Sequence, residues 1–434
     1  MNSSGHSVHR QTFHYQGCPF DVFYAFKDRL HLFFLDSSLP RGGDQFSYIG
    51  FDPFTTVKGG DLPGLKKVFE RYRLARGGLA FPAGAAGYWG YDGALFFGFY
   101  DTIFALDHQN HRLIISSLSR ARLKDAIKQC KAAGVFSPKA DPPPAENARL
   151  PKNSLHFKSN FTKAAYMKAV RQALEHVRRG DIYQINLSHQ IKARLPRWRN
   201  YAHPAFIYKN LRQAFPSEFG AYFDDGKQVI LSASPERFLK LHKGLAQVKP
   251  MKGTRPRGKT MIQDRHLKEQ LLKSPKEIAE LLMVTDLERN DLGRVCDYSS
   301  VKVRTMRAIE TYASVFQATS TIEGRLRKDC DEFDLLRAAF PSGSVTGCPK
   351  IEAMKIIKKL EHAPRGLYTG ALGYISFSGD MDFNVLIRSM FLKPGTITLN
   401  TGGGIVADSN PGDEWQETLI KARPLLDTLK KVFK

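Results

Sequence analysis

The chain has 434 residues, of which 42% are hydrophobic and 11% aromatic, so it can form a large ordered core. No run reaches the ~18 uncharged apolar residues of a membrane span, and the N-terminal residues form no apolar secretory segment. We therefore expect a cytoplasmic protein with no membrane contact. The formal net charge is +23, but the cations are scattered and no zinc finger, aromatic RNA-binding motif or basic arm accompanies them, which argues against nucleic acid as a partner.

Cysteine usage agrees with a reducing compartment. The cysteines are odd in number and widely spaced, and no C-x-x-C pair occurs among Cys18, Cys130, Cys296, Cys330 and Cys348. This pattern predicts ordinary reduced thiols, without disulfides or a thiolate zinc site.

The first expected helix covers about residues 64–76, where apolar residues recur at helical spacing before Gly77-Gly78. Short strands surround it. A polar, proline-rich segment at 134–160, with three prolines at 142–144, then predicts a linker between an N-terminal region (1–133) and a C-terminal region (161–434).

After this segment, Asn160 or Thr162 can cap a helix that runs to Gly180. The strand 181–188 follows, with one polar face of alternating residues, Gln184, Asn186 and Ser188. That face either contacts solvent or lines a cleft. Asp225-Gly226 between two apolar runs predicts a hairpin.

The last third mixes helices with an expected strand meander. The meander covers 368–378, 383–392 and 396–400, with turns at Gly379-Asp380 and Pro394-Gly395, and helices are expected at about 264–284, 331–340, 349–360 and 411–432. Consecutive strands with helices grouped around them predict an α+β fold of packed sheets covered by helices.

Two acidic helical motifs could hold a cation. Glu277 and Glu280 share one helix face, as do Glu414 and Glu417. Clustered carboxylates repel one another unless a cation joins them, and Mg²⁺ prefers one or two carboxylates completed by water and substrate oxygens. Each motif alone is also common on solvated helices.

Three further features suit an anionic ligand. A glycine run, Thr401-Gly402-Gly403-Gly404, is expected at the end of a strand just before the second acidic helix, where the backbone can approach a ligand closely. The segment 341–350 is a Gly/Ser/Thr loop that opens a helix, and Arg388 offers a planar fork for a carboxylate. Lys252, between Met251 and Gly253, is either solvated or, in a dry cleft, a nucleophile with a lowered pKa.

Taken together and in order, these motifs resemble the chorismate-utilising enzyme family. The segments that carry the resemblance are GDIYQINLS, SASPERF, PMKGTRPR, AELLMVTDLERNDLGRV, RAAFPSGSVTGCPK, GALGYISF, and TGGGIVADS followed by EWQET. It covers about 160–430 strongly and the N-terminus more weakly, through FLDSS, YIGFDP, GYWGYD and FALDHQNHR. The resemblance implies two β-sheets packed face to face with helices outside, and chorismate bound with Mg²⁺.

The resemblance also implies roles for individual residues. It assigns the metal to Glu280 and Glu417, with Glu277 and Glu414 holding metal-bound water, and the ring carboxylate of chorismate to Gly402, Gly403 and Arg388. Other implied substrate contacts are Gln184, Thr254, Thr346, Gly347, Lys350 and Lys421.

Within the family, two positions imply which reaction is catalysed. One favours amination of chorismate over its hydration, and the other favours amination at ring carbon C4 over C2. Gln184 occupies the place of a water-activating lysine in the isochorismate and salicylate synthases, and a neutral amide is a poor base for water. Lys252 replaces a small residue of anthranilate synthases and resembles the aminodeoxychorismate synthase branch, which implies attack by this lysine on C2 of chorismate and amination at C4 for folate synthesis. Glu236 matches the family's general acid.

The resemblance leaves several points open. Gln317 stands where many members carry a histidine, so it cannot supply a positive charge. No glutaminase segment is recognised, so ammonia is expected from a separate glutamine amidotransferase subunit. Anthranilate synthase component I is the alternative activity, a basic nucleic-acid-binding protein is a second alternative, and a tryptophan site near 34–38 is undecided.

Overall fold

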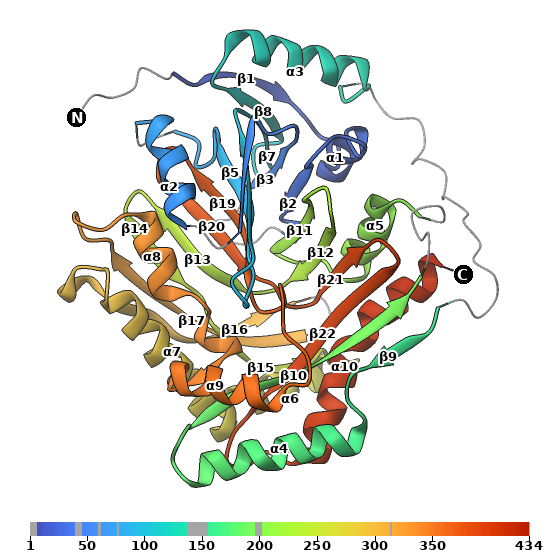
Figure 1. Ribbon diagram of the computed structural model, residues 1–434, viewed down its shortest axis with the longest axis vertical. Helices are drawn as coiled ribbons and strands as arrows, with labels where there is room; N and C mark the ends of the chain where they lie inside the picture. Colours follow the sequence, from blue (N-terminus) through green and yellow to red (C-terminus); the bar gives the residue numbers. More distant parts are fainter. Residues whose placement is uncertain are drawn as a thin grey trace.

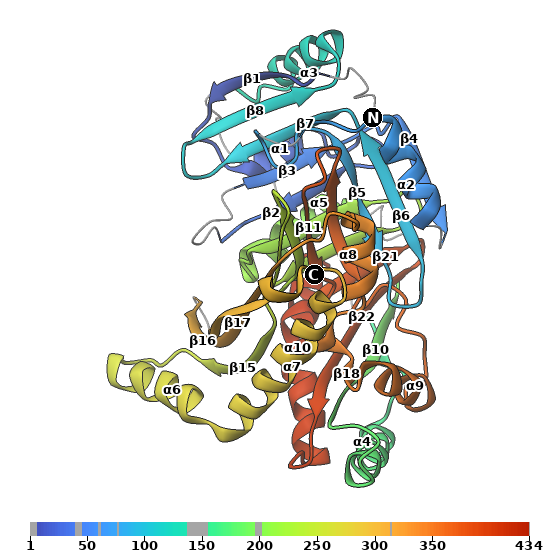
Figure 2. The same ribbon diagram turned by 90° about the vertical axis from the view of Figure 1, so that its left-hand side faces the viewer.

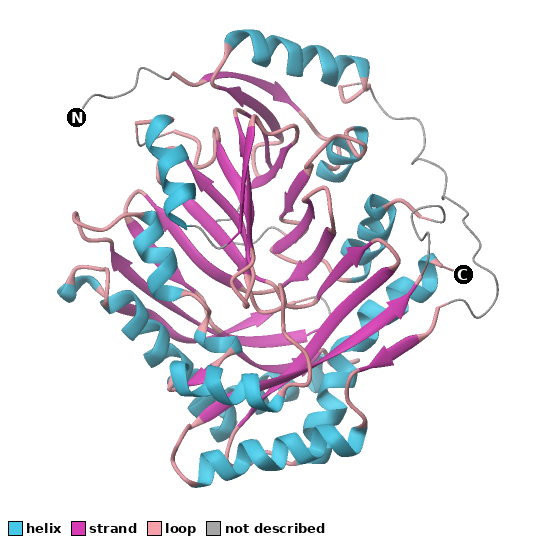
Figure 3. Ribbon diagram, viewed as in Figure 1, coloured by secondary structure: helices cyan, strands magenta, loops and turns pink. Residues whose placement is uncertain are grey.

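The expected α+β fold, with two sheets packed together and helices outside, is confirmed by the computed structural model of the chain (Figure 1). The structure describes residues 7–39, 46–59, 62–75, 78–136, 155–195, 202–312 and 315–433. Figure 3 shows strands in the interior with helices around them. Most of the proline-rich segment expected to be a linker, from 137 to 154, lies outside the described residues.

The larger sheet has twelve described strands, and all its pairs are antiparallel. Their order is β1 (His9–His14), β8 (Arg112–Ser117), β7 (Thr102–Asp107), β3 (Phe46–Gly50), β2 (Phe33–Asp36), β11 (Phe219–Asp224), β12 (Val229–Ser234), β21 (Ser389–Lys393), β22 (Thr396–Ile405), β10 (Gln184–Arg194) and β18 (Gly347–Cys348), with β9 (Phe157–Ser159) paired to β10.

The smaller sheet has ten described strands and is also antiparallel. Its order is β15 (Met251–Pro256), β17 (Val315–Arg325), β14 (Leu245–Val248), β13 (Arg237–His242), β20 (Met381–Val385), β19 (Ala371–Ser376), β5 (Gly84–Trp89), β6 (Leu95–Tyr100) and β4 (Thr55–Gly59), with β16 (Lys302–Thr311) paired to β17.

Ten described α-helices cover these sheets. They are α1 (Pro19–Ala25), α2 (Leu62–Arg71), α3 (Arg120–Ala132), α4 (Lys163–Arg178), α5 (Pro204–Ala214), α6 (Met261–Lys273), α7 (Pro275–Gly293), α8 (Glu332–Ala339), α9 (Lys350–Leu360) and α10 (Pro411–Val432). Figures 1 and 2 show α3 at one end of the molecule and α4 at the other.

The core is divided into layers by the sheets. An aromatic cluster that includes Phe33, Tyr48, Phe81 and Tyr374 combines inward-facing residues of both sheets. Separate apolar clusters join the larger sheet to α1, α3, α5 and the end of α10, and the smaller sheet to α2 and α8. Burial of apolar area in these layers is the main force that holds the two sheets together.

Both regions of the chain contribute to both sheets. The N-terminal β2 pairs with the C-terminal β11, and the N-terminal β5 pairs with the C-terminal β19. Each sheet therefore runs without interruption across the boundary between the two sequence regions.

Several expected elements differ in their ends. The helix expected at 64–76 ends at Arg71, and Tyr72 then packs on Phe377. The helix expected at 264–284 is two helices, because Ser274 caps a new helix whose first residue is Pro275. The hairpin at Asp225-Gly226 and the helix capped by Thr162 are confirmed.

The expected meander is wrong in one important respect. The run 383–392 is not one strand: β20 belongs to the smaller sheet and β21 to the larger, and the chain changes sheet around Arg388, whose φ is +49°. The glycine run lies at the end of β22, as expected, and is paired there with β10.

None of the described helices is both long and apolar enough to cross a bilayer. The five cysteines, which all fall within the described ranges, are free thiols.

Candidate active site

The predicted site residues gather where the chain passes from one sheet to the other. One passage joins β12 to β13 through Pro235 and Glu236, and a second joins β20 to β21 just before Ser389. The backbone amide of Val385 donates to the carbonyl of Glu236, which ties the two passages together. Side chains that leave these passages can therefore reach groups on both sheets.

Four glutamates approach one another from two helices. Glu277 and Glu280 lie on α7, and Glu414 and Glu417 lie on α10. Besides burial, the charge of Glu417 on α10 acts to raise the pKa of Glu280 on α7 and of its own neighbour Glu414, so the carboxylates of the two helices lie near one another. Burial is the largest cause that raises the pKa of both Glu280 and Glu414.

Cations of the protein partly neutralise this cluster. Lys421 lies 2.5 Å from Glu417, and Arg255 lies 2.9 Å from Glu277. Burial acts to raise the pKa of Glu417, but Lys421, Lys276 and Lys252 together outweigh it and the net pKa is lowered. Glu417 is half exposed, which screens this interaction.

The donor set fits a hard divalent cation. Glu414 Oε1 accepts a 2.6 Å hydrogen bond from the Ser409 hydroxyl, whereas its buried Oε2 has no hydrogen-bond partner among the described residues. Within the same residues, no three His, Cys, Asp or Glu side chains already have the spacing of a metal site. Mg²⁺ needs only one or two carboxylates and takes its other oxygens from water and substrate, so two carboxylates of this cluster would be enough to hold it.

The glycine run leaves room beside these carboxylates. A Cβ at Gly403 would lie 3.0 Å from Glu414 Oε2 and 3.7 Å from Glu417 Oε1. A Cβ at Gly404 would lie 2.9 Å from Gln184 Nε2 and 3.4 Å from Lys252 Nζ. The run therefore allows the acidic cluster, Gln184 and the lysine amine to approach one strand closely.

A β-bulge aims Lys252 into this space. The pairing of β15 with β17 shifts register between Lys252 and Thr254, and Gly253 between them has φ +80°. Bulges of this kind redirect a side chain beside functional sites. Lys252 Nζ donates a 3.1 Å hydrogen bond to the carbonyl of Ser344.

Lys252 and Glu236 are perturbed in opposite directions. Burial is the largest cause in both cases: it lowers the pKa of Lys252 and raises the pKa of Glu236 to about 7. Their mutual attraction opposes both shifts, and the nearby Ser344 side chain opposes the shift of Glu236. Desolvation outweighs the attraction between the two charges, so burial favours the neutral form of each group relative to its ordinary state in water.

Gln184 and Gln317 lie buried near these groups, and each has a side-chain carbonyl oxygen without a partner in the described part of the chain. Gln184 is on the predicted polar face of β10, which therefore lines the site and is not solvated. Gln317, Tyr312 and Arg388 line a small cavity of about 40 Å³, and burial lowers the pKa of Arg388.

The other residues predicted to contact substrate make contacts within the protein. Lys350 pairs with Asp291 and donates to the carbonyl of Ala339 at 3.0 Å, and the Thr346 hydroxyl donates to the carbonyl of Ser342. Gly347 pairs with Ile185, Thr254 is exposed, and Gly402 faces Ser188. Lys421 also donates to the carbonyl of Gly402 at 3.1 Å. Their roles toward substrate stay predictions.

Sequence reasoning missed the supports of the site. Ser344 contacts both Lys252 and Glu236, Arg365 donates to the carbonyls of Val345 and Asn186, and Glu288 accepts from the turn that carries Ser344. All three are buried. The sequence signal for Glu288 and Arg365 was only that a charged residue stands close to apolar segments. This signal does not reveal which groups the charged residue contacts.

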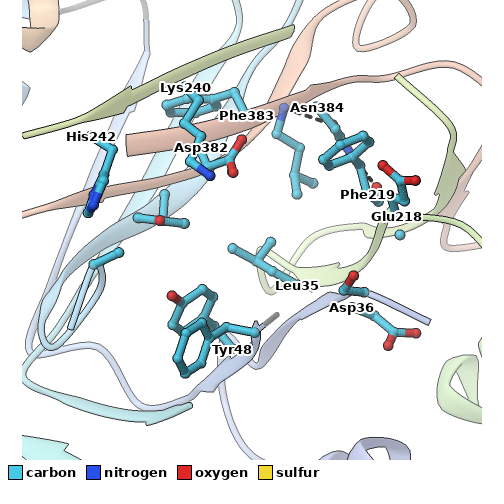
Figure 4. Close-up of a pocket in the computed structure, with 17 residues that line it drawn as sticks. Leu35, Asp36, Tyr48, Glu218, Phe219, Lys240, His242, Asp382, Phe383 and Asn384 are labelled. Carbon is cyan, nitrogen blue, oxygen red and sulfur yellow. Dashed lines mark hydrogen bonds between the residues drawn. The ribbon is translucent and has the colours of Figure 1, made fainter. Parts of the chain in front are cut away.

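A larger cavity of about 250 Å³ lies elsewhere between the sheets (Figure 4). Leu35, Asp36 and Ser37 of the segment 34–38 line it, opposite Lys240 and Asp382. Asp36 is fully buried and accepts hydrogen bonds from Arg212 and Tyr208. None of the four glutamates, Lys252 or Glu236 lines this cavity.

Comparison with known proteins identifies the relatives of this chain. A family model described as "chorismate binding enzyme" matches residues 60–427. Aminodeoxychorismate synthase component 1 of Bacillus subtilis (strain 168) is 33% identical over 438 residues, which cover 91% of each chain. The crystal structure of anthranilate synthase component I from Streptococcus pneumoniae TIGR4 superimposes with a TM-score of 0.77 at 30% identity, over 89% of this chain and 93% of that one.

Some relatives are substantially longer. Anthranilate synthase component 1 of Aquifex aeolicus (strain VF5) is 41% identical over 275 residues, which cover 63% of this chain and 55% of that protein. An anthranilate synthase component I-like protein of Synechocystis sp. matches over 64% of its own length. The chain thus spans less than two thirds of several curated relatives that it matches.

Proposed function

This chain belongs to the family of chorismate-binding enzymes, and on that premise we propose that it aminates chorismate at C4, giving 4-amino-4-deoxychorismate. The observation that carries the proposal is the pair formed by Lys252 and Glu236. Burial makes the lysine easier to deprotonate and the carboxyl easier to protonate. Two groups perturbed in this way suit a nucleophile and a general acid in one site.

In the first proposed step, the neutral amine of Lys252 forms a bond to C2 of chorismate. The two ring double bonds shift, the bond from C4 to its hydroxyl oxygen breaks, and Glu236 gives its proton to that oxygen, which leaves as water. In the second step ammonia bonds to C4, the double bonds shift back, and the bond between C2 and Lys252 breaks. The proton lost by the incoming nitrogen can return to Glu236.

Bound Mg²⁺ would neutralise the ring carboxylate and assist departure of the C4 oxygen. Glu280 and Glu417 would hold it directly, and Glu277 and Glu414 would hold its water. The glycines of β22 leave the space in which a carboxylate can meet this cluster. We propose ammonia from a separate glutamine amidotransferase as the nitrogen source.

Anthranilate synthase component I is the second candidate, because relatives of that name match at 41% and 30% identity. In that reaction ammonia attacks C2 itself and pyruvate is lost. Lys252 argues against it, because an amine beside Gly404 and Gln184 would occupy the approach to C2 in this proposal.

The decisive experiment is product analysis of Lys252→Ala with chorismate, Mg²⁺ and ammonium. Removal of the nucleophile should slow formation of the 4-amino product at least about a hundredfold, and the residual product should shift toward 2-amination because C2 is now open. Mass spectrometry of the products measures both effects. Lys249→Ala is the matched control, because Lys249 pairs with Glu310 outside the site.

Two further measurements sharpen the test. Wild-type enzyme given chorismate without ammonia should accumulate an adduct on the peptide that carries Lys252. Glutamine alone should not replace ammonium. Full rate and pure 4-amino product from Lys252→Ala would contradict the covalent role, and 2-amino product from the wild type would favour the second candidate.

A further inference from the structure

Glu288 on α7 is a buried carboxylate that the proposed mechanism does not use. The residue is only 1% exposed. Its Oε1 accepts hydrogen bonds from the Ser342 hydroxyl at 2.9 Å and from the backbone amide of Gly343 at 2.8 Å. A buried carboxyl is costly unless its bonds compensate for lost water, so these two bonds fix Glu288 to the beginning of the turn 342–346.

The opposite end of the same turn is held by a buried cation. Arg365 is 3% exposed, donates to the carbonyl of Val345 at 2.8 Å and pairs with Glu361 at 2.8 Å. A carboxyl oxygen thus meets an amide hydrogen at the start of the turn, and a cation meets a carbonyl at its end. This arrangement complements the polarity of the turn.

Ser344 lies between the two anchors and contacts both proposed catalytic groups. Its carbonyl accepts from Lys252 Nζ at 3.1 Å, and its side chain lies near enough to Glu236 to lower the pKa of that carboxyl. The hydroxyls of Ser342 and Ser344 are 3.0 Å apart. Hydrogen bonds therefore connect Glu288 through the turn to Lys252, and the same turn places Ser344 beside Glu236.

We propose that Glu288 is a positioning residue, which, with Arg365, holds the turn 342–346 so that Ser344 fixes the relative placement of Lys252 and Glu236. This inference rests on the proposed roles of those two groups. Because the two steps need the amine and the acid on the same substrate at once, displacement of the turn lowers the rate of chemistry more than the binding of chorismate.

The first measurement is steady-state kinetics of Glu288→Leu and Glu288→Gln, with total product counted whichever carbon is aminated. Leucine removes the acceptor, so kcat should fall by about tenfold or more while KM for chorismate changes less than about threefold. Glutamine keeps an acceptor oxygen for Ser342 and Gly343, so it should restore kcat to within about threefold of wild type.

The control is Glu332→Leu, which removes an equally buried glutamate of α8 that pairs with Arg73, away from this turn. It should leave kcat per folded molecule unchanged. If Glu288→Leu does not fold, Ser342→Ala is the second variant, since it removes one of the two bonds to Glu288 and should lower kcat in the same direction. Equal loss of kcat in Glu288→Gln and Glu288→Leu, or in Glu332→Leu, would overturn the proposal.

The second measurement needs no catalysis. Amide hydrogen exchange of the peptide spanning 341–347 should speed up severalfold in Glu288→Leu and stay near wild type in Glu288→Gln. Unchanged exchange in Glu288→Leu, or faster exchange with unchanged kcat, would contradict positioning. If the wild type instead makes the 2-amino product, the proposed function fails, while exchange and kcat still decide the role of Glu288.

Discussion

At the scale of single residues, the site depends on desolvation exceeding charge attraction. Lys252 and Glu236 attract one another, which alone would keep both charged. The fold removes enough water around them that the neutral forms gain instead. Burial also raises the pKa of Glu280, while the charge of Lys252 opposes that shift, so the electrostatics of the acidic cluster and of Lys252 depend on one another.

The pKa of Glu236 makes a prediction for stability. Burial raises this pKa from 4.5 to about 7. Between those values the folded state keeps a proton that the unfolded state has lost, so the free energy of unfolding decreases as pH rises through the window. Glu236→Gln cannot titrate, so from about pH 5 to pH 8 the Tm of wild type should fall relative to that of the variant. Thermal unfolding at both pH values measures this.

The same substitution separates stability from catalysis. A glutamine cannot donate the proton, so kcat should drop by about 10²–10⁴ at every pH, whereas wild-type kcat should decline as pH rises through about 7. A wild-type kcat that stays level up to pH values where Glu236 is ionised would contradict the role of general acid.

Gly404 gives a steric prediction. A methyl group there would meet Gln184 Nε2 at 2.9 Å and Lys252 Nζ at 3.4 Å. Gly404→Ala should therefore reduce kcat by about tenfold or more through displacement of the amine, with a small change in Tm because flexible side-chain ends can move. Gly293→Ala is the control, since nothing lies within 4 Å of its added methyl group; it should keep full activity.

Motifs in the sequence pointed to candidate catalytic residues, but not to the residues that support them in the fold. Lys252, Glu236 and the four glutamates stand in recognisable motifs, and the structure brings them together. Glu288 and Arg365 could not be assigned, because burial of a charge depends on partners far along the chain, such as Glu288 with Gly343. Gln184 is an intermediate case. The alternation of polar and apolar residues predicted that it lies on a polar face of its strand, but only the fold showed that this face lines the site.

At the scale of elements, local signals explain what was predicted and what was not. Ser274-Pro275 is a helix start in sequence, and the structure breaks the expected long helix there. The change of sheet at Arg388 had no such signal, because an arginine with positive φ is held by its surroundings and not by its own preference. The bulge at Gly253 also arises from pairing with β17.

The glutamates of α7 and α10 lie close together, which leads to a prediction about Mg²⁺ binding. Each helix brings a pair of glutamates to one cluster, and Glu414 Oε2 is buried there with no hydrogen-bond partner in the described residues. Mg²⁺ should therefore raise the Tm of the wild type by binding the folded state. Glu280→Gln and Glu417→Gln should each weaken this shift and remove most activity, because neutral amides are poorer ligands.

Thermal unfolding over a Mg²⁺ titration measures the effect without turnover. Glu352→Gln is the control, because Glu352 is an exposed glutamate of α9 paired with Lys355. A Mg²⁺-dependent rise in Tm that is the same in Glu280→Gln, Glu417→Gln and wild type would place the ion elsewhere.

At the scale of the whole molecule, the two regions recognised in sequence share their sheets. β2 with β11 and β5 with β19 form continuous pairs across the regions. The aromatic cluster between the sheets likewise combines Tyr48 and Phe81 with Tyr374, and Phe81 stacks on Tyr374 with ring centroids 4.3 Å apart. Composition can reveal a break such as 134–160, but strand pairing across it is non-local and leaves no mark in either segment.

This sharing predicts that residues 161–434 do not fold alone, although they carry every residue of the proposed catalytic site. Removal of 1–160 would leave the edges of β11 and β19 unpaired and expose Tyr374, Phe223 and their neighbours to water. Unpaired edges and exposed aromatic surface favour aggregation over a cooperative fold. The fragment should therefore lack a sharp thermal transition and lack Mg²⁺-dependent stabilisation. Co-expression of 1–150 with 151–434 should restore both, because the sheets can re-form without a covalent connection. A cooperative, Mg²⁺-stabilised fragment 161–434 would show instead that the N-terminal strands only extend a catalytic unit that is complete without them.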